Sequence, residues 1–191
     1  MQFKRACNFI LSKLQKELPA HLLYHSINHT TDVYRAAERI AKGEGITNDE
    51  RKLLLTAASF HDSGFLKARE GHETESCNLA RRYLPGYNYN AVEIELICGM
   101  IMATKLPQSP HTLLEEILCD ADLDYLGRDD FFLLSNILFS ELHTECLIKG
   151  EREWNMEQAE FMGNHHYFTH TSVKTRQANK EHYIKLVKSK I

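Results

Sequence analysis

Hydrophobic residues recur along most of the chain at the three- to four-residue spacing that is typical of amphipathic α-helices. The stripe Val33, Ala37 and Ile40 predicts one such helix. The segment 51–62 (RKLLLTAASFHD) is apolar on nearly all sides, which predicts a central, buried helix. No segment shows the two-residue alternation of a half-buried strand, so the pattern indicates helices throughout.

Similar stripes predict helices in the rest of the chain, at about residues 72–84, 94–101, 113–121, 129–149, 154–167 and 173–191. Pro85 and Gly86 are expected to stop the first of these helices, and Pro107 and Pro110 mark residues 105–111 as a loop. We therefore predict an all-α fold: a single-domain bundle of about eight or nine helices over residues 1–191.

Composition narrows the class of protein. A chain of 191 residues with 43% hydrophobic and 26% charged residues is expected to form one globular domain. The net charge of -3 provides no positive excess, so neither a nucleic acid nor a membrane is expected as a partner. Five widely spaced cysteines, an odd number, argue against a secreted disulfide scaffold. Because no signal peptide or apolar run of about 18 residues is present, we expect a cytoplasmic protein.

Four residues stand out for chemistry among 11 histidines and many acids: His29, His61, Asp62 and Asp122. A histidine and an acid beside a nearly continuous apolar helix are costly unless they pair or bind an ion. Two imidazoles and two carboxylates drawn from three helices would form a mixed nitrogen and oxygen site. Such a site suits one divalent ion, which could be Mn, Fe, Co, Ni, Zn or Mg.

Each of these residues also has an ordinary interpretation. His25 and His29 could lie on a solvated helix face, and His61 could be satisfied by its neighbour Asp62. Asp122 could simply favour the turn that precedes Gly127. If these ordinary interpretations hold, the protein binds no stoichiometric metal. Measuring its metal content therefore distinguishes them from the metal-site hypothesis.

The order H…HD…D, with its flanking residues, resembles the HD-domain metal-dependent phosphohydrolase superfamily. The resemblance covers about residues 21–128, and it is carried by the segments YHSINHT (24–30), SFHDSGF (59–65), GHE (71–73) and CDADL (119–123). It implies an all-helical metal core at about 21–128, followed by a C-terminal helical extension at 129–191.

The resemblance also implies a set of ligands. By position, His29, His61, Asp62 and Asp122 match the four metal ligands of the superfamily. Asp120 competes for the last place, but Asp122 follows a small residue and precedes a leucine, as the ligand of the family commonly does. Members that bind two metals have further histidines where this chain has Ala103 and Thr104. One tightly held ion is therefore expected, with His72 near the substrate or on a weaker second ion.

The segment YHSINHTTDV (24–33) is similar to the YHNxxHxxDV motif of cyclic nucleotide phosphodiesterases. In that branch the first histidine protonates the leaving oxygen, which implies that His25 is a general acid here. Ser26 stands in place of the asparagine, and the histidine that follows the HD motif there is missing. We therefore do not predict a cyclic nucleotide phosphodiesterase.

Mechanism follows from the expected ion. The metal would activate a water, and Asp62 could both ligate the ion and accept that water's proton. Predicted substrate-binding residues, chosen because they lie close to the motifs, are His72, Lys67, Arg69, Lys105 and Arg128.

The predicted function is a metal-dependent phosphohydrolase that cleaves a phosphomonoester or phosphodiester of a small molecule, with a nucleotide as the expected substrate. Two alternatives stay open. One is a non-catalytic, metal-containing module for nucleotide binding or signalling, and the other is a purely structural helical domain.

Overall fold

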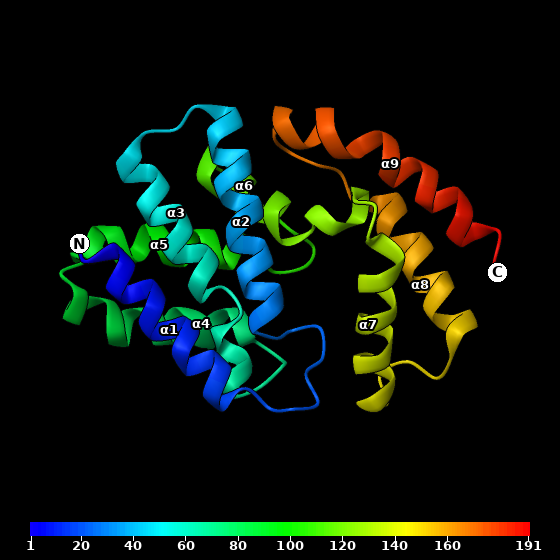
Figure 1. Ribbon diagram of the computed structural model, residues 1–191, viewed down its shortest axis with the longest axis horizontal. Coiled ribbons are helices and arrows are strands. Elements are labelled where there is room, and N and C mark those ends of the chain that lie inside the picture. Colours follow the sequence, from blue (N-terminus) through cyan, green and yellow to red (C-terminus); the bar gives the residue numbers. More distant parts are fainter.

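The computed structural model describes residues 1–191 and is entirely helical (Figure 1). The α-helices are α1 Phe3–Glu17, α2 Ile27–Glu44, α3 Asn48–Phe60, α4 His72–Tyr83, α5 Ala91–Ala103, α6 Leu113–Asp122, α7 Phe131–Thr144, α8 Glu151–Asn164 and α9 His170–Lys188. Three short 3-10 helices join them: η1 Ser63–Leu66, η2 Leu84–Tyr87 and η3 Asp124–Gly127. The prediction of an all-α fold with eight or nine helices is confirmed. No helix is both long enough and apolar enough to cross a membrane.

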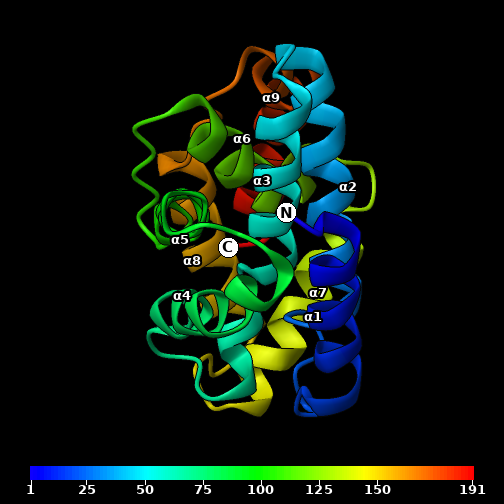
Figure 2. The same cartoon turned by 90° about the vertical axis from the view of Figure 1, so that its left-hand side faces the viewer.

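Helix α3 occupies the centre of the larger part of the molecule. All eight residues from Leu53 to Phe60 are buried, because α1, α2, α4, α5 and α6 each contact this helix. Figure 2 shows α3 between α1 and α2 on one side and α4 to α6 on the other. Thr47 caps the helix through a reciprocal pairing with Glu50. The continuous apolar segment therefore forms the centre of the core, as predicted.

Two hydrophobic clusters hold the molecule together. The larger one contains 26 buried residues from α1 to α6, and the smaller one contains eight buried residues, mostly from η3 and α7 to α9. In Figure 1, α7, α8 and α9 stand together to the right of the core, with α2 between the two parts. Tyr24, which precedes α2, belongs to the smaller cluster and so links the two.

Helix ends differ from the expected ones where tertiary contacts or turns intervene. The predicted helix 129–149 ends at Thr144, because Cys146 adopts a left-handed backbone with φ of 58°. The N–H of Cys146 bonds to the carbonyl of His143, and that of Leu147 bonds to Leu142, which is the Schellman termination. Helix α1 is not among the helices that the pattern predicted, although Ala6, Ile10 and Leu14 are buried along one of its faces.

Candidate metal centre

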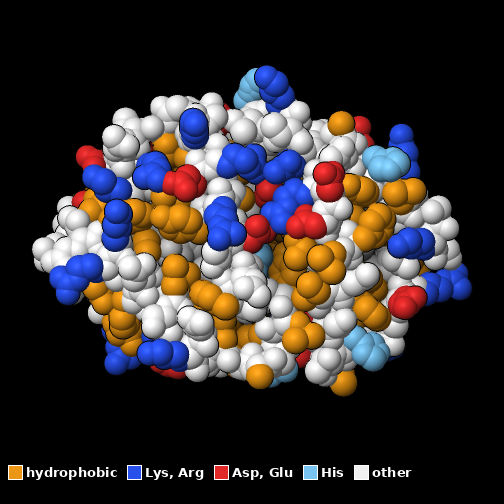
Figure 3. Space-filling view, in the orientation of Figure 1, with side chains coloured by type: hydrophobic (Ala, Val, Ile, Leu, Met, Phe, Trp, Pro, Cys, Tyr) orange, Lys and Arg blue, Asp and Glu red, His pale blue; other side chains and the backbone are white.

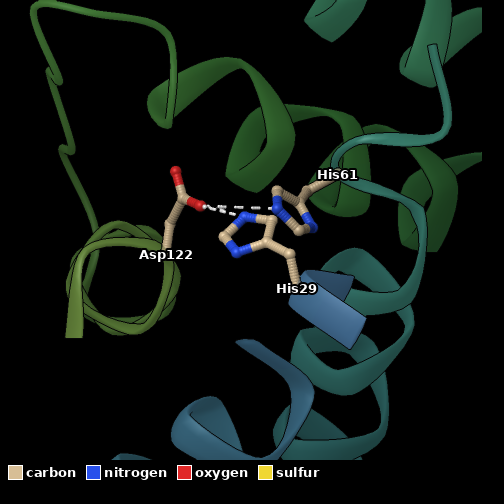
Figure 4. Close-up of side chains that lie close together, drawn as sticks. All are labelled: His29, His61 and Asp122. Carbon is tan, nitrogen blue, oxygen red and sulfur yellow. Dashed lines mark hydrogen bonds and ion pairs between the residues drawn. The ribbon is translucent and has the colours of Figure 1, made fainter. Parts of the chain in front are cut away.

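His29 lies in the first turn of α2 and points towards the C-terminal end of α6 (Figure 4). Its Nε2 atom is 3.1 Å from Oδ1 of Asp122, which is 93 residues further along the chain. The imidazole packs against the ring of Tyr24, with ring centroids 4.7 Å apart. Packing between α2 and α6 thus brings together a nitrogen and an oxygen donor that the sequence places far apart.

His61 and Asp62 follow directly after α3 and are both buried. Nδ1 of His61 donates to the carbonyl oxygen of Ala58 at 2.9 Å, so its Nε2 is the ring nitrogen that faces the carboxylates. That Nε2 is 3.3 Å from Oδ2 of Asp62 and 3.4 Å from Oδ1 of Asp122. Oδ2 of Asp62 also lies 3.4 Å from Nε2 of His29. Donor atoms from three segments therefore face one another.

Two of these buried atoms, Nε2 of His61 and Oδ2 of Asp62, have no geometrically sound hydrogen-bond partner. Orphaned buried polar atoms are costly unless a bound group satisfies them. A first-row divalent ion with bonds of about 2.1 Å places neighbouring ligands about 3.0–3.4 Å apart. The Nε2 atoms of His29 and His61 lie 3.1–3.4 Å from the nearest carboxylate oxygens of Asp122 and Asp62, which is this spacing. His29, His61 and Asp122 form a candidate metal site by proximity alone. Asp62 is not part of this mutually close group, although its Oδ2 lies 3.3 Å from Nε2 of His61 and 3.4 Å from Nε2 of His29.

The electrostatics of the centre fit the same reading. Burial by itself would lower the pKa of His29, but Asp122 and Asp62 raise that pKa to about 9. The same two carboxylates raise the pKa of His61 well above its usual value. The pKa of Asp122 is lowered, since its bonds to the two imidazoles outweigh the effect of burial. Without an ion, protons on the imidazoles balance the carboxylates, and a divalent ion would replace those protons.

Asp120, the competitor for the fourth place, has a different setting. It is fully buried, and its Oδ1 accepts the N–H of Phe168 at 2.9 Å. Its Oδ2 accepts the N–H of Thr169 at 2.8 Å and the hydroxyl of Thr169 at 2.6 Å. Asp120 thus anchors the start of α9, while Asp122 faces the two histidines.

His25 is held by Glu141, a residue that sequence analysis did not identify. Nδ1 of His25 is 2.5 Å from Oε1 of Glu141, and the N–H groups of Tyr24 and His25 both donate to Oε2. The His25 ring also stacks on Phe65 at 4.3 Å. Because a carboxylate accepts at Nδ1, the Nε2 of His25 is the ring atom left for a ligand.

A signal for Glu141 is present in the sequence. Glu141 lies three residues after Leu138 and next to Leu142, on the apolar stripe of α7, and it is fully buried. A lone acid on the buried face of a helix requires a partner. The sequence cannot name that partner, since Glu141 reaches back 116 residues to His25.

A cavity of about 680 Å³ connects the metal centre to α7 and α8. His25, His72, Arg69 and Lys105 all line it. Nε2 of His72 is 3.4 Å from Oδ1 of Asp62, the second oxygen of that carboxylate. His72 can come this close because Gly64 has no side chain: a Cβ there would lie 1.9 Å from the His72 carbonyl oxygen.

The predicted cationic residues have three different settings. Arg69 lines the cavity, but its guanidinium is held by Glu141 and Glu145. Lys105 lines the cavity and has no carboxylate partner. Lys67 pairs with Glu75 on the exposed surface and does not line the cavity.

Arg128 lies at a second, smaller cavity of about 350 Å³, on which His29 and Asp122 also border. Its guanidinium pairs with three acids, which are Asp32, Asp124 and Asp130. Figure 3 shows lysine and arginine side chains gathered with acidic ones over the middle of the face that it draws. Arg128 thus ties η3 to α2, and its charge is already balanced.

Comparison with known proteins supports the fold and identifies the family. The chain matches the HD domain family over residues 26–124, which is more than half of its length, and it therefore belongs to that family. The matched region contains His29, His61, Asp62 and Asp122. No curated protein matches the chain.

Two crystal structures share the fold. A predicted HD superfamily hydrolase from an uncultured Thermotogales bacterium has a TM-score of 0.65 and 20% identity, covering 97% of this chain and 89% of that one. A protein from Lactobacillus plantarum has a TM-score of 0.66 and 18% identity, covering 100% of this chain and 98% of that one. Both likenesses extend over α7 to α9, beyond the segment matched by the family.

Proposed function

We propose that this protein is a metal-dependent phosphohydrolase that cleaves a phosphate ester of a small molecule, with a nucleotide as the leading substrate. The observation that carries the proposal is a buried set of nitrogen and oxygen donors that opens onto a cavity. Membership of the HD domain family and the fold shared with a predicted HD superfamily hydrolase support it.

The position of each residue in the centre suggests its role. His29, His61, Asp62 and Asp122 would hold one divalent ion, which supplies a water of lowered pKa and polarises a phosphoryl oxygen. Asp62 presents Oδ2 to the centre and Oδ1 to His72. A carboxylate in this place can take the proton that a nucleophilic water releases.

His25 is suited to protonate the leaving oxygen. Its ring is fixed between Phe65 and Glu141, and it lines the same cavity as Asp62. Lys105 is the side-chain cation of the cavity that lacks a carboxylate partner, so it can pair with a phosphate. His72 is a neighbour of Asp62 and lines the cavity, where it can bind substrate.

Metal analysis together with an assay of generic substrates tests the proposal. The purified protein should contain one divalent ion and hydrolyse p-nitrophenyl phosphate or bis-p-nitrophenyl phosphate. His61→Ala and Asp62→Ala should each lower the rate by about a hundredfold or more. His182→Ala, at an exposed position on α9, is the matched control and should keep the wild-type rate.

The outcomes separate the functional classes. A wild-type rate that survives both site variants would overturn the proposal. Metal binding and tight nucleotide binding without turnover would instead favour the non-catalytic module, and a protein without stoichiometric metal would favour a structural domain.

A further inference from the structure

A further cavity, of about 520 Å³, lies between the C-terminal half of α8, the loop that follows α5 and the segment that precedes α9. We call it the α8 cavity. None of the four candidate metal ligands lines it. It shares Leu106, Glu157 and Phe161 with the large cavity beside the metal centre, so the two cavities adjoin. The proposed function gives the α8 cavity no role.

Gln108, in the loop after α5, gives the α8 cavity a buried acceptor without a donor. Its Nε2 donates to the carbonyl oxygen of Cys119 at 3.1 Å, which fixes the orientation of the side-chain amide. Its Oε1 is buried and has no hydrogen-bond partner. An orphaned buried acceptor is costly unless a bound group donates to it. Gln108 therefore favours a ligand that carries an N–H or O–H group.

His165, which follows α8, gives the same cavity a buried donor without an acceptor. Its Nδ1 lies 3.2 Å from Nζ of Lys180, a residue that is 1% exposed and that also donates to the carbonyl oxygen of His165. An ammonium group only donates, so Nδ1 accepts and the ring proton is on Nε2. Burial and the charge of Lys180 lower the pKa of His165 to about 3, which keeps the ring neutral at neutral pH. This Nε2–H group is buried and has no hydrogen-bond partner.

The charged groups of the α8 cavity are acidic. Glu157 and Glu160, one helical turn apart on α8, both line it. No lysine or arginine lines the cavity to balance these carboxylates. A cationic ligand is therefore attracted, whereas a ligand with a carboxylate or phosphate is repelled. Phe161 and Phe168 add aromatic surface, on which an apolar chain next to a cationic group can pack.

We propose that the α8 cavity is a second binding site, for a small organic cation that also carries a carboxamide. The carboxamide supplies both missing partners, an N–H group for Oε1 of Gln108 and a carbonyl oxygen for Nε2 of His165. The cationic group pairs with Glu157 and Glu160, and the chain between the two groups packs on Phe161. Binding at this site requires neither a metal ion nor hydrolysis, so the inference does not depend on the proposed function.

Three matched compounds test the inference. The probe is ε-aminocaproamide, which has an ammonium group, an apolar chain and a carboxamide, whereas hexanamide lacks the ammonium group and hexylamine lacks the carboxamide. Each compound is titrated against the protein and followed by NMR, with the ring signals of His165 as the report from the cavity. The probe should bind about tenfold more tightly than either of the other two compounds. Its dissociation constant should be the same with and without a metal chelator.

Two variants assign the binding to the α8 cavity. Glu157→Gln combined with Glu160→Gln should weaken binding of ε-aminocaproamide by about tenfold and leave hexanamide unchanged. Gln108→Met removes the orphaned acceptor and should weaken ε-aminocaproamide by about fivefold, with hexylamine unchanged. Glu151→Gln is the matched control, since Glu151 is an exposed acid on the same helix and lies outside the cavity.

Binding of ε-aminocaproamide within threefold of both hexanamide and hexylamine would overturn the inference. So would ring signals of His165 that do not move, or a preference that both variants retain in the folded state, as judged by their melting curves. Selective binding of ε-aminocaproamide by a protein without phosphatase activity would support this inference and overturn the proposed function alone. Phosphatase activity in a protein that binds the three compounds equally would support the proposed function and overturn this inference.

Discussion

The buried carboxylate of Glu141 on α7 accepts hydrogen bonds from both Nδ1 and the main-chain N–H of His25. These bonds fix the position of the histidine ring and its tautomer. The two residues are 116 positions apart, and the pair joins α7 to the part of the chain that contains the candidate metal centre. Arg69 binds the same carboxylate, which prevents the acid from turning away. The pair makes α7 part of the candidate active site.

Replacing Glu141 should impair catalysis more than substrate binding. In Glu141→Gln a neutral amide replaces the charged acceptor of the Nδ1–H of His25. We therefore expect kcat to fall about 10- to 100-fold with little change in KM. Glu145→Gln removes the other carboxylate that holds Arg69 and is the control. A kcat loss that is equal in both variants would contradict a role in positioning His25.

Asp122 and Asp120 should give opposite results. Asp122→Ala removes a donor from the centre, so the protein should lose bound metal, as measured by elemental analysis, while it stays folded. Asp120→Ala deletes three hydrogen bonds to Phe168 and Thr169 and should lower the free energy of unfolding by about 2–4 kcal/mol. It should keep the metal. Retained metal in Asp122→Ala would remove Asp122 from the ligand set.

Metal affinity should rise with pH. In the metal-free protein the pKa of His29 is about 9, so this imidazole is protonated at neutral pH and must lose its proton to bind an ion. Each pH unit from about 6 to about 9 should therefore tighten binding about tenfold per released proton, with a plateau above that range. The affinity is measured by competition with a chelator at each pH. A dissociation constant that does not vary with pH would show that metal binding displaces no proton from His29.

Glu141 should also make stability depend on acid. Burial would raise its pKa, but hydrogen bonds from His25 and Arg69 lower it to about 2 in the folded state, against 4.5 in the unfolded chain. Because the folded pKa is the lower one, the stabilisation is complete above about pH 4.5 and disappears as the pH falls towards 2. The stability difference between wild type and Glu141→Gln should shrink by about 3 kcal/mol over this range. Urea unfolding measures it, and a difference that stays constant with pH would show that the ionised pair does not stabilise the fold.

Much of the fold was predictable from local pattern. Helical periodicity along the chain and the apolar segment before His61 were sufficient to predict an all-α bundle with a buried central helix. The helix ends were less predictable, because they depend on non-local contacts and on particular turns. Helix α9 begins at His170, where Asp120 of α6 and the hydroxyl of Thr169 hold its first turn.

The cationic residues show why proximity in sequence is a weak guide to a site. Lys67 follows the HD motif by only five residues, yet it points to solvent and pairs with Glu75. Lys105 lies more than 40 residues from that motif and lines the cavity. A long, charged side chain follows the surface of its own element, so its target depends on which neighbours pack there.

The sequence by itself determined the helical class, the family and the types of donor that could bind an ion, because periodicity and short motifs are local properties of the chain. Only the tertiary structure decided that Asp122 rather than Asp120 faces the histidines, that Glu141 supports His25, and that α7 and α8 line the cavity beside the candidate metal centre. These facts depend on packing between segments that are tens of residues or more apart in the sequence. A local sequence pattern does not specify which helix faces pack against each other.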